Sequence, residues 1–143
     1  MGAYNFQPRF VPFVRDGSKR HSIRAKRTRP DRPGNMLHLF TRQRTKQCEL
    51  LGRSVCVKVE DTVISASHQV FVDGVELNAD EKNALAYCDG FRSLGVARAF
   101  EQMMAFWNGR LPFHGDIIHW SKKLSRPSPQ RAVSRQRKAR RAA

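Results

Sequence analysis

Hydrophobic and polar residues alternate along several short stretches of the chain, a pattern typical of strands that have one buried face. The clearest run is 55–59, in which valines alternate with Cys56 and Lys58. A second run, 69–77, carries Asp73-Gly74 at its centre, and this pair suits a tight hairpin turn. Gly52 marks an expected bulge or bend in a longer strand. The expected strands are 21–24, 36–42, 48–59, 63–67, the two arms of 69–77, and 114–120.

Helical spacing of apolar residues marks further stretches. Residues 7–16 are expected to form a short helix whose proline falls in the first turns, where proline is tolerated. A second helix is expected to end near residue 87, with Asn78 or Asp80 as its N-cap. A third is expected over 93–107. Its stripe at three- and four-residue steps, expected to face the core, is Val96, Phe100, Met103, Met104 and Trp107.

This order of elements predicts an α+β domain. Short strands whose chain returns over long distances suit a small closed or half-closed β-barrel with helices at its side. The length of 143 residues suits one domain, expected over 1–121. Residues 122–143 combine prolines, few large apolar side chains and many cations, so we expect a disordered basic tail there.

The charge of the chain indicates that this domain binds a partner. The chain has 27 Lys and Arg against 12 Asp and Glu, a formal net charge of +15. Positive charge is concentrated in 15–32 and in the tail, whereas 60–89 is acidic and has Lys82 as its only Lys or Arg. This balance argues against an ordinary neutral small-molecule enzyme and makes a polyanion the first partner to consider.

Other features narrow the setting. No apolar run is long enough to span a membrane, and the first ten residues have no signal-peptide core, which predicts a cytoplasmic protein. Three cysteines, Cys48, Cys56 and Cys88, cannot form a disulfide framework without leaving one unpaired, and they lack the spacing of a zinc knuckle, so they are expected to be reduced, mostly buried thiols. His114 and His119 fall on opposite faces of the expected strand. We therefore expect no metal site and no cofactor.

The segment that carries candidate chemistry follows the first helix. Gly17 can turn the chain sharply, which places Lys19 near the start of the strand 21–24. On that strand, Ser22 and Arg24 share one face. If the residue between them points into the core, they line a cleft together, with Lys19 close by. An ammonium, a hydroxyl and a guanidinium together suit an anion or a polarised carbonyl.

This segment resembles the G-x-K-x-x-T-x-R signature of the ASCH domain, a PUA-like β-barrel family associated with RNA. The signature positions hold Gly17, Lys19, Ser22 and Arg24. The segment 89–93, reading DGFRS, and the later AFW with its closing strand are similar to the E-G-F-x-S segment of the same family. The resemblance spans about 4–120 in the same element order. It implies a small PUA-like β-barrel with flanking helices.

One branch of that family is the small bacterial amidohydrolases that remove the acetyl group from acetylcytidine. The resemblance implies a hydroxyl nucleophile, an activating lysine and a carboxylate. In this chain Ser22 stands at the position of the nucleophilic threonine, Lys19 at that of the lysine, and Asp89 at that of a glutamate. Serine keeps the hydroxyl but frees its rotamer, and aspartate shortens the reach by one methylene.

Two functions therefore follow from the sequence, a nucleic-acid-binding module and a hydrolase acting on a modified base. For the first, RNA is favoured by the resemblance alone, and binding is expected to depend on salt more than on base sequence. Exposed aromatic residues for base stacking are not evident. A basic accessory protein with an acidic protein partner, and a metal-free nuclease, remain alternatives. The expected nucleic-acid-binding residues are Lys19, Arg20, Ser22, Arg24, Lys26, Arg27 and Arg29.

Overall fold

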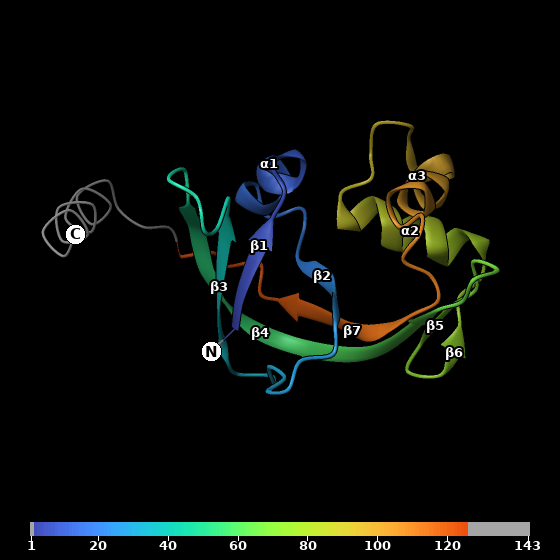
Figure 1. Ribbon diagram of the computed structural model, residues 1–143, viewed down its shortest axis with the longest axis horizontal. Coiled ribbons are helices and arrows are strands. Elements are labelled where there is room, and N and C mark those ends of the chain that lie inside the picture. The colour runs from blue at the N-terminus through green and yellow to red at the C-terminus, as the bar shows by residue number, and fades with distance from the viewer. Residues whose placement is uncertain (1, 126–143) are drawn as a thin grey trace, which may run out of the picture.

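The structure is a computed structural model that describes residues 2–125 (Figure 1). Most of the expected disordered tail, residues 126–143, lies outside the described residues. The elements in chain order are β1 (Gly2–Phe6), η1 (Pro8–Phe10), α1 (Val11–Arg15), β2 (His21–Ala25), β3 (Met36–Thr41), β4 (Glu49–Ile64), β5 (Val70–Val72), β6 (Val75–Glu76), α2 (Ala79–Asp89), η2 (Val96–Arg98), α3 (Ala99–Phe106) and β7 (Phe113–Trp120). The domain is α+β, as predicted.

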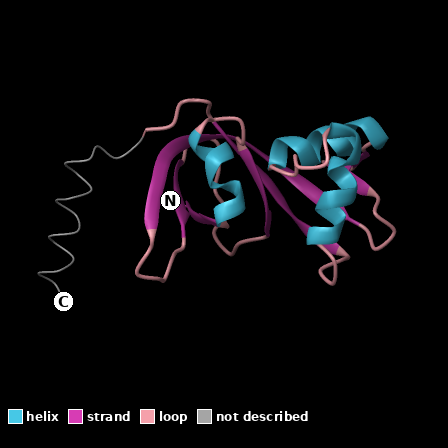
Figure 2. Cartoon of the chain, turned by 90° about the horizontal axis from the view of Figure 1, so that it is seen from above, coloured by secondary structure: helices cyan, strands magenta, loops and turns pink. Residues whose placement is uncertain are grey.

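A single seven-stranded sheet curls into a half-barrel around the core (Figures 1 and 2). The strand order runs β1-β3-β4-β5-β6, and β7 pairs with both β4 and β2. The β1–β3 pair is parallel, and the other pairs are antiparallel. Among residues 2–125 no backbone pairing joins β1 to β2, so the curled sheet leaves a seam between these two strands.

The long strand β4 makes the curl. Its first half pairs with β3 and its second half with β7 and β5. Extra residues at Leu51 and Val57 form bulges against β3 and β7, and bulges bend a strand and increase its twist. The prediction of a bulge near Gly52 is therefore confirmed.

Two predictions about strands were wrong. The sequence pattern gives separate strands at 48–59 and 63–67, but β4 is continuous because the polar residues between them keep their backbone pairing with β7. The pattern also gives no strand at 2–6. β1 forms because Tyr4 and Phe6 are buried and the strand pairs with β3, although its glycine and alanine are weak strand formers.

The helices lie on one side of the curled sheet (Figure 2). Asn78 caps α2 in a reciprocal capping box with Glu81, which confirms the predicted cap. Gly90 ends α2 at φ 118°, and a Cβ there would lie 2.6 Å from the Phe10 ring, so only glycine fits. The short helix predicted at 7–16 and the hairpin at 69–77 are also confirmed.

The third predicted helix starts later than expected. Residues 93–95 form a loop, and regular helix begins only at Ala99. Val96 is consequently 55% exposed, which corrects its placement in the core-facing stripe, whereas Met103, Met104 and Trp107 are buried.

The chain stays bonded to β4 after β7 ends. Ser121 donates its backbone N–H to Val55, and Arg53 and Ser125 exchange two backbone hydrogen bonds of 2.8 Å. Leu124 packs over Gly52, where a Cβ would meet its side chain at 2.6 Å. Residues 122–125, which the sequence places in the tail, are therefore part of the folded domain.

The cysteines differ from expectation. All are free, but only Cys56 is buried. Cys48 precedes β4 in an exposed loop, and Cys88 lies on the solvent side of the last turn of α2. Within residues 2–125, no helix is long and apolar enough to cross a membrane. The same residues contain no group of three His, Cys, Asp or Glu side chains that could hold a metal ion.

Candidate functional site

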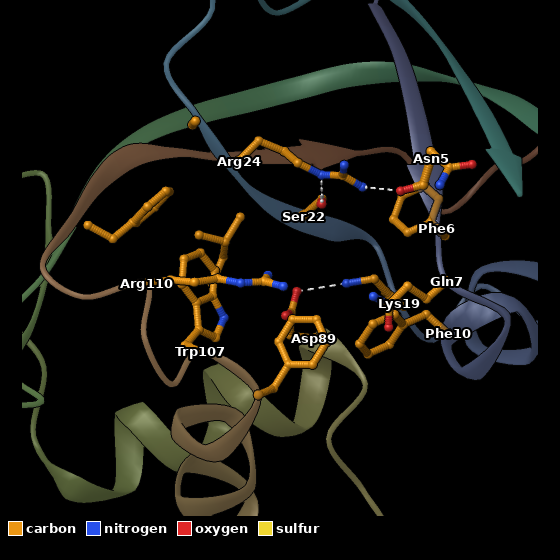
Figure 3. Close-up of a pocket in the computed structure, with 14 residues that line it drawn as sticks. Asn5, Phe6, Gln7, Phe10, Lys19, Ser22, Arg24, Asp89, Trp107 and Arg110 are labelled. Atoms are coloured by element: carbon orange, nitrogen blue, oxygen red, sulfur yellow. Dashed lines mark hydrogen bonds and ion pairs between the residues drawn. The ribbon is translucent and has the colours of Figure 1, made fainter. Parts of the chain in front are cut away.

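A cleft of about 460 Å³ opens at the seam between β1 and β2 (Figure 3). Its walls come from β1, the α1–β2 loop, β2, the end of α2, and the loop between α3 and β7. The lining residues are Asn5, Phe6, Gln7, Phe10, Lys19, Ser22, Ile23, Arg24, Ala25, Asp89, Phe106, Trp107, Arg110 and Phe113. The three residues singled out from the motif, Lys19, Ser22 and Arg24, therefore share one cavity.

A buried ion pair crosses the cleft. Lys19 Nζ donates to Asp89 Oδ1 at 2.7 Å and to the carbonyl of His21 at 2.9 Å. Gly17 at φ 79° turns the chain after α1, and the Lys19 N–H then bonds the Phe13 carbonyl at 2.9 Å. These bonds fix the backbone that carries the lysine.

A second contact ties the two partners of this ion pair together. The Arg92 guanidinium donates to Ser18 Oγ at 3.0 Å and to the Tyr87 carbonyl at 3.0 Å. Ser18 precedes Lys19, and Arg92 follows Asp89 in the DGFRS segment. The segment that carries Lys19 therefore contacts the segment that carries Asp89, and the Arg92–Ser18 hydrogen bond helps to hold the two residues close together.

Burial and charge act on this pair in opposite directions. Burial lowers the pKa of the Lys19 amine, and the nearby Arg24 and Arg92 charges lower it further, while Asp89 opposes the shift. Burial alone would raise the pKa of Asp89. The Lys19 ammonium and His21 outweigh that effect and hold the pKa of the carboxyl well below its usual range. Asp89 is thus ionised at neutral pH.

His21 belongs to this cluster, which sequence reasoning missed. Its side chain is 8% exposed, and Nε2 lies 3.2 Å from the same Asp89 oxygen that Lys19 contacts. Its ring centroid is 5.5 Å from that of His119, which pairs with Glu60. The strand period places His21 opposite Ser22, but the curl of the sheet and the end of α2 enclose that face as well.

Ser22 and Arg24 form the other half of the cleft. Arg24 Nε donates to Ser22 Oγ at 2.6 Å, and its terminal nitrogen donates to the Asn5 carbonyl at 2.6 Å, across the seam (Figure 3). The guanidinium lies 5.1 Å from the centroid of Phe6 and 5.5 Å from that of Tyr4. Arg24 therefore bridges two strands that have no backbone pairing.

Ser22 is not activated by Lys19 in this arrangement. No hydrogen bond joins the Ser22 hydroxyl to Lys19 within residues 2–125, and the lysine nitrogen is directed at Asp89 and a carbonyl. Neither does the hydroxyl proton have an acceptor among these residues. The group is thus available to donate to a ligand.

Aromatic side chains line the cleft, but none of the five that do so is fully exposed, which agrees with the expectation that exposed aromatic residues for stacking are not evident. Phe6, Phe10 and Trp107 are buried behind its surface, whereas Phe106 and Phe113 are partly exposed. The sequence does not show that these aromatic residues border a cavity, because residues of the closed core have the same apolar spacing.

Arg110 adds a further cation that sequence reasoning missed. It comes from the loop after α3 and points into the cavity toward Asp89 and Trp107 (Figure 3). Lys19, Arg24 and Arg110 together outnumber the single carboxylate that lines the cleft. The site therefore favours a ligand that carries negative charge and a flat apolar surface.

The other cations expected to bind nucleic acid differ in whether the protein already pairs their side chains. Lys26 Nζ contacts Asp61 at 2.7 Å and Asp116 at 2.6 Å, so two carboxylates neutralise it. Arg27 lies 4.0 Å over the Tyr4 ring and donates to the Ala3 carbonyl. By contrast, Arg20 and Arg29 are exposed, and neither side chain has a hydrogen bond or ion pair within the described residues.

Comparison with known proteins does not assign the chain to a family. No family model, no curated protein and no solved structure matches the chain.

Proposed function

We propose that the protein is an RNA-binding module with a PUA-like barrel of the ASCH type, and that the β1–β2 cleft holds one base with its phosphate. One observation carries the proposal: Lys19, Ser22 and Arg24, which occupy the signature positions, line one cavity with aromatic walls. Cations suit the phosphate, and flat rings suit a base.

The polar groups of the cleft fit this ligand in detail. Arg24 presents a planar guanidinium next to the Ser22 hydroxyl, whose oxygen accepts from Arg24 Nε while its proton has no acceptor in the described residues, an arrangement that can bind a phosphate oxygen or the edge of a base. Arg110 is exposed at the mouth and can turn toward a phosphate. Asp89 balances one of the buried cations, so the cleft keeps its excess charge without an unpaired buried ammonium.

Fluorescence anisotropy with a labelled single-stranded oligonucleotide tests the proposal. We expect binding that weakens steeply between about 50 and 200 mM salt, because counterions are released from the phosphates. Arg110→Gln should weaken it several-fold. The matched control, Arg98→Gln, removes the same charge from a residue outside the cleft that pairs with Glu101, and should have little effect. Equal effects of the two variants, or no binding at low salt, would contradict the proposal.

A second candidate is an amidohydrolase for an acetylated base. The observation in its favour is that Lys19, Ser22 and Asp89, the three residues implied by the resemblance, line the same cleft. This reaction requires Lys19 to lose its proton and to turn from Asp89 toward Ser22. The Ser22 oxygen then attacks the acetyl carbonyl, and its proton passes to Lys19, which returns it to the leaving amine. Water then hydrolyses the acetyl-serine ester.

The test is release of acetate from acetylcytidine. Release that Ser22→Ala abolishes would establish the hydrolase, whereas a wild-type protein that releases none would eliminate it. The second outcome leaves the binding proposal intact, because binding does not require Lys19 to lose its proton.

A further inference from the structure

We infer that a single RNA strand leaves the cleft over η1 and continues into a groove between α1 and the β3–β4 loop, where cations of that loop bind its backbone phosphates. We call residues 42–48 of this loop the basic loop. The inference rests on the proposed function and extends it, because it names the path of the polymer and a second contact surface.

The groove adjoins the cleft. It has a volume of about 420 Å³ and is lined by Pro8, Val11, Pro12, Arg15, Thr41, Arg42, Gln47 and Glu49. Gln7 lines the cleft and Pro8, the next residue, lines the groove. Successive Cα atoms are only about 3.8 Å apart, so the backbone that borders the cleft also borders the groove.

A cation marks the ridge between the two hollows. Arg9 is exposed on η1, and its guanidinium carbon lies 5.2 Å from the Phe10 centroid and 5.5 Å from that of Phe106, both lining residues of the cleft. A strand that crosses this ridge therefore passes a guanidinium already supported by aromatic rings.

The basic loop presents unpaired cations in a fixed shape. Arg42, Arg44 and Lys46 are exposed, and none forms an ion pair within residues 2–125. Thr45 Oγ1 donates to the Arg42 carbonyl at 2.7 Å and accepts from the Gln47 N–H at 3.2 Å. Such internal bonds reduce the entropy lost when the loop binds a ligand.

A further bond fixes the loop to the cleft itself. The Gln43 N–H donates to Asn5 Oδ1 at 2.9 Å, and Asn5 lines the cleft. The position of the loop is therefore set by the same strand that forms one wall of the binding cavity, and a ligand that spans both meets a preformed surface.

The charge of this surface favours a phosphate backbone. Glu49 is the only acid that lines the groove, and Arg15 neutralises it through two contacts, one of 2.8 Å. In the sequence-predicted cluster at 15–32, Lys26 is bound by two carboxylates, and the exposed Arg20 and Arg29 line neither the cleft nor the groove. A polynucleotide fits better than an acidic protein, because the path begins in an aromatic-walled cleft.

The experiment compares two triple variants of the full chain that remove equal charge. Arg42→Gln/Arg44→Gln/Lys46→Gln alters the basic loop. Arg20→Gln/Arg29→Gln/Arg32→Gln is the charge-matched comparison: these arginines are also exposed, and the sequence favours Arg20 and Arg29 for binding, but none of the three lines the cleft or the groove. Binding is measured with oligouridylate of about three and about twelve nucleotides, the latter within the site sizes of single-strand-binding modules.

We expect the basic-loop variant to bind the longer oligonucleotide about tenfold or more weakly, and to lower its salt slope by about 2, given about 0.7 per phosphate contact. Binding of the short oligonucleotide should be unchanged, since it occupies the cleft alone. The control variant should lose much less. Equal losses from the two variants, or a basic-loop loss seen with poly-glutamate and not with RNA, would overturn the inference.

These outcomes separate the two proposals. If the short oligonucleotide fails to bind wild type and Arg110→Gln has no effect on either length, the cleft proposal fails. If the short oligonucleotide binds through Arg110 but the basic-loop variant behaves as wild type with the long one, only the path fails.

Discussion

The buried ion pair between Lys19 and Asp89 allows us to predict how much unfolding free energy is lost when Asp89 is replaced. In Asp89→Asn the carboxylate is lost, and a lysine that is 3% exposed is left without its counterion. At pH 7 the cheapest response is for Lys19 to lose its proton. Against an ordinary lysine pKa near 10.4 this costs about 4.6 kcal/mol, at about 1.36 kcal/mol for each pH unit.

That figure is an upper limit, because part of the cost is already present in the wild type. Burial lowers the pKa of Lys19 even with Asp89 beside it. Breaking a buried pair by removing one partner typically costs about 3–5 kcal/mol. We therefore expect Asp89→Asn to lose about 3–4 kcal/mol of unfolding free energy at neutral pH.

Urea denaturation followed by tryptophan fluorescence measures this loss, since Trp107 and Trp120 are both buried. The control is Lys19→Met/Asp89→Leu, which removes both charges and should recover most of the loss, because an apolar pair in a buried site leaves no unpaired ion. A single-variant loss below about 1 kcal/mol, or a double variant no better than the single, would refute the reasoning.

The pH dependence has a defined sign for each partner. The Asp89 pKa is depressed in the folded state, so its contribution is present above about pH 3.9 and is lost as the pH falls through the folded value. The Lys19 pKa is also lowered on folding, so between the folded pKa and about pH 10.4 the unfolded chain binds more protons, and stability rises with pH in that window. The deficit of Asp89→Asn should therefore shrink from neutral to alkaline pH. A constant deficit would contradict this account.

Three further predictions concern packing and burial. Gly115→Ala should destabilise by about 1–3 kcal/mol in urea, because a Cβ there would lie 2.2 Å from the Arg24 carbonyl oxygen; a wild-type midpoint would contradict it. Tyr4→Phe should cost about 1.5–3 kcal/mol in the same assay, since the hydroxyl donates to the buried Asp31 carboxylate, and a neutral result would argue against that bond. In the native protein, a thiol reagent should label the two exposed cysteines and spare Cys56, where burial raises the thiol pKa; full labelling before unfolding would refute this.

The elements with strong local signals were predictable from sequence. The Asp73-Gly74 turn, the Asn78 cap and the closing strand expected at 114–120 have signals in neighbouring residues of the chain, and each forms as expected. The continuity of β4 and the presence of β1 depend on pairing with distant strands. Local propensity carries no information about such partners.

The amino-acid sequence by itself determined the α+β class, the excess of positive charge, and the grouping of Lys19, Ser22 and Arg24 near one strand. Tertiary structure alone decided which charges remain available. It pairs Lys26 with two acids from β4 and β7, buries His21 beside Asp89, and leaves the basic loop unpaired next to the cleft. The physical reason is that an ion pair depends on distance and burial, which folding sets between residues remote in sequence.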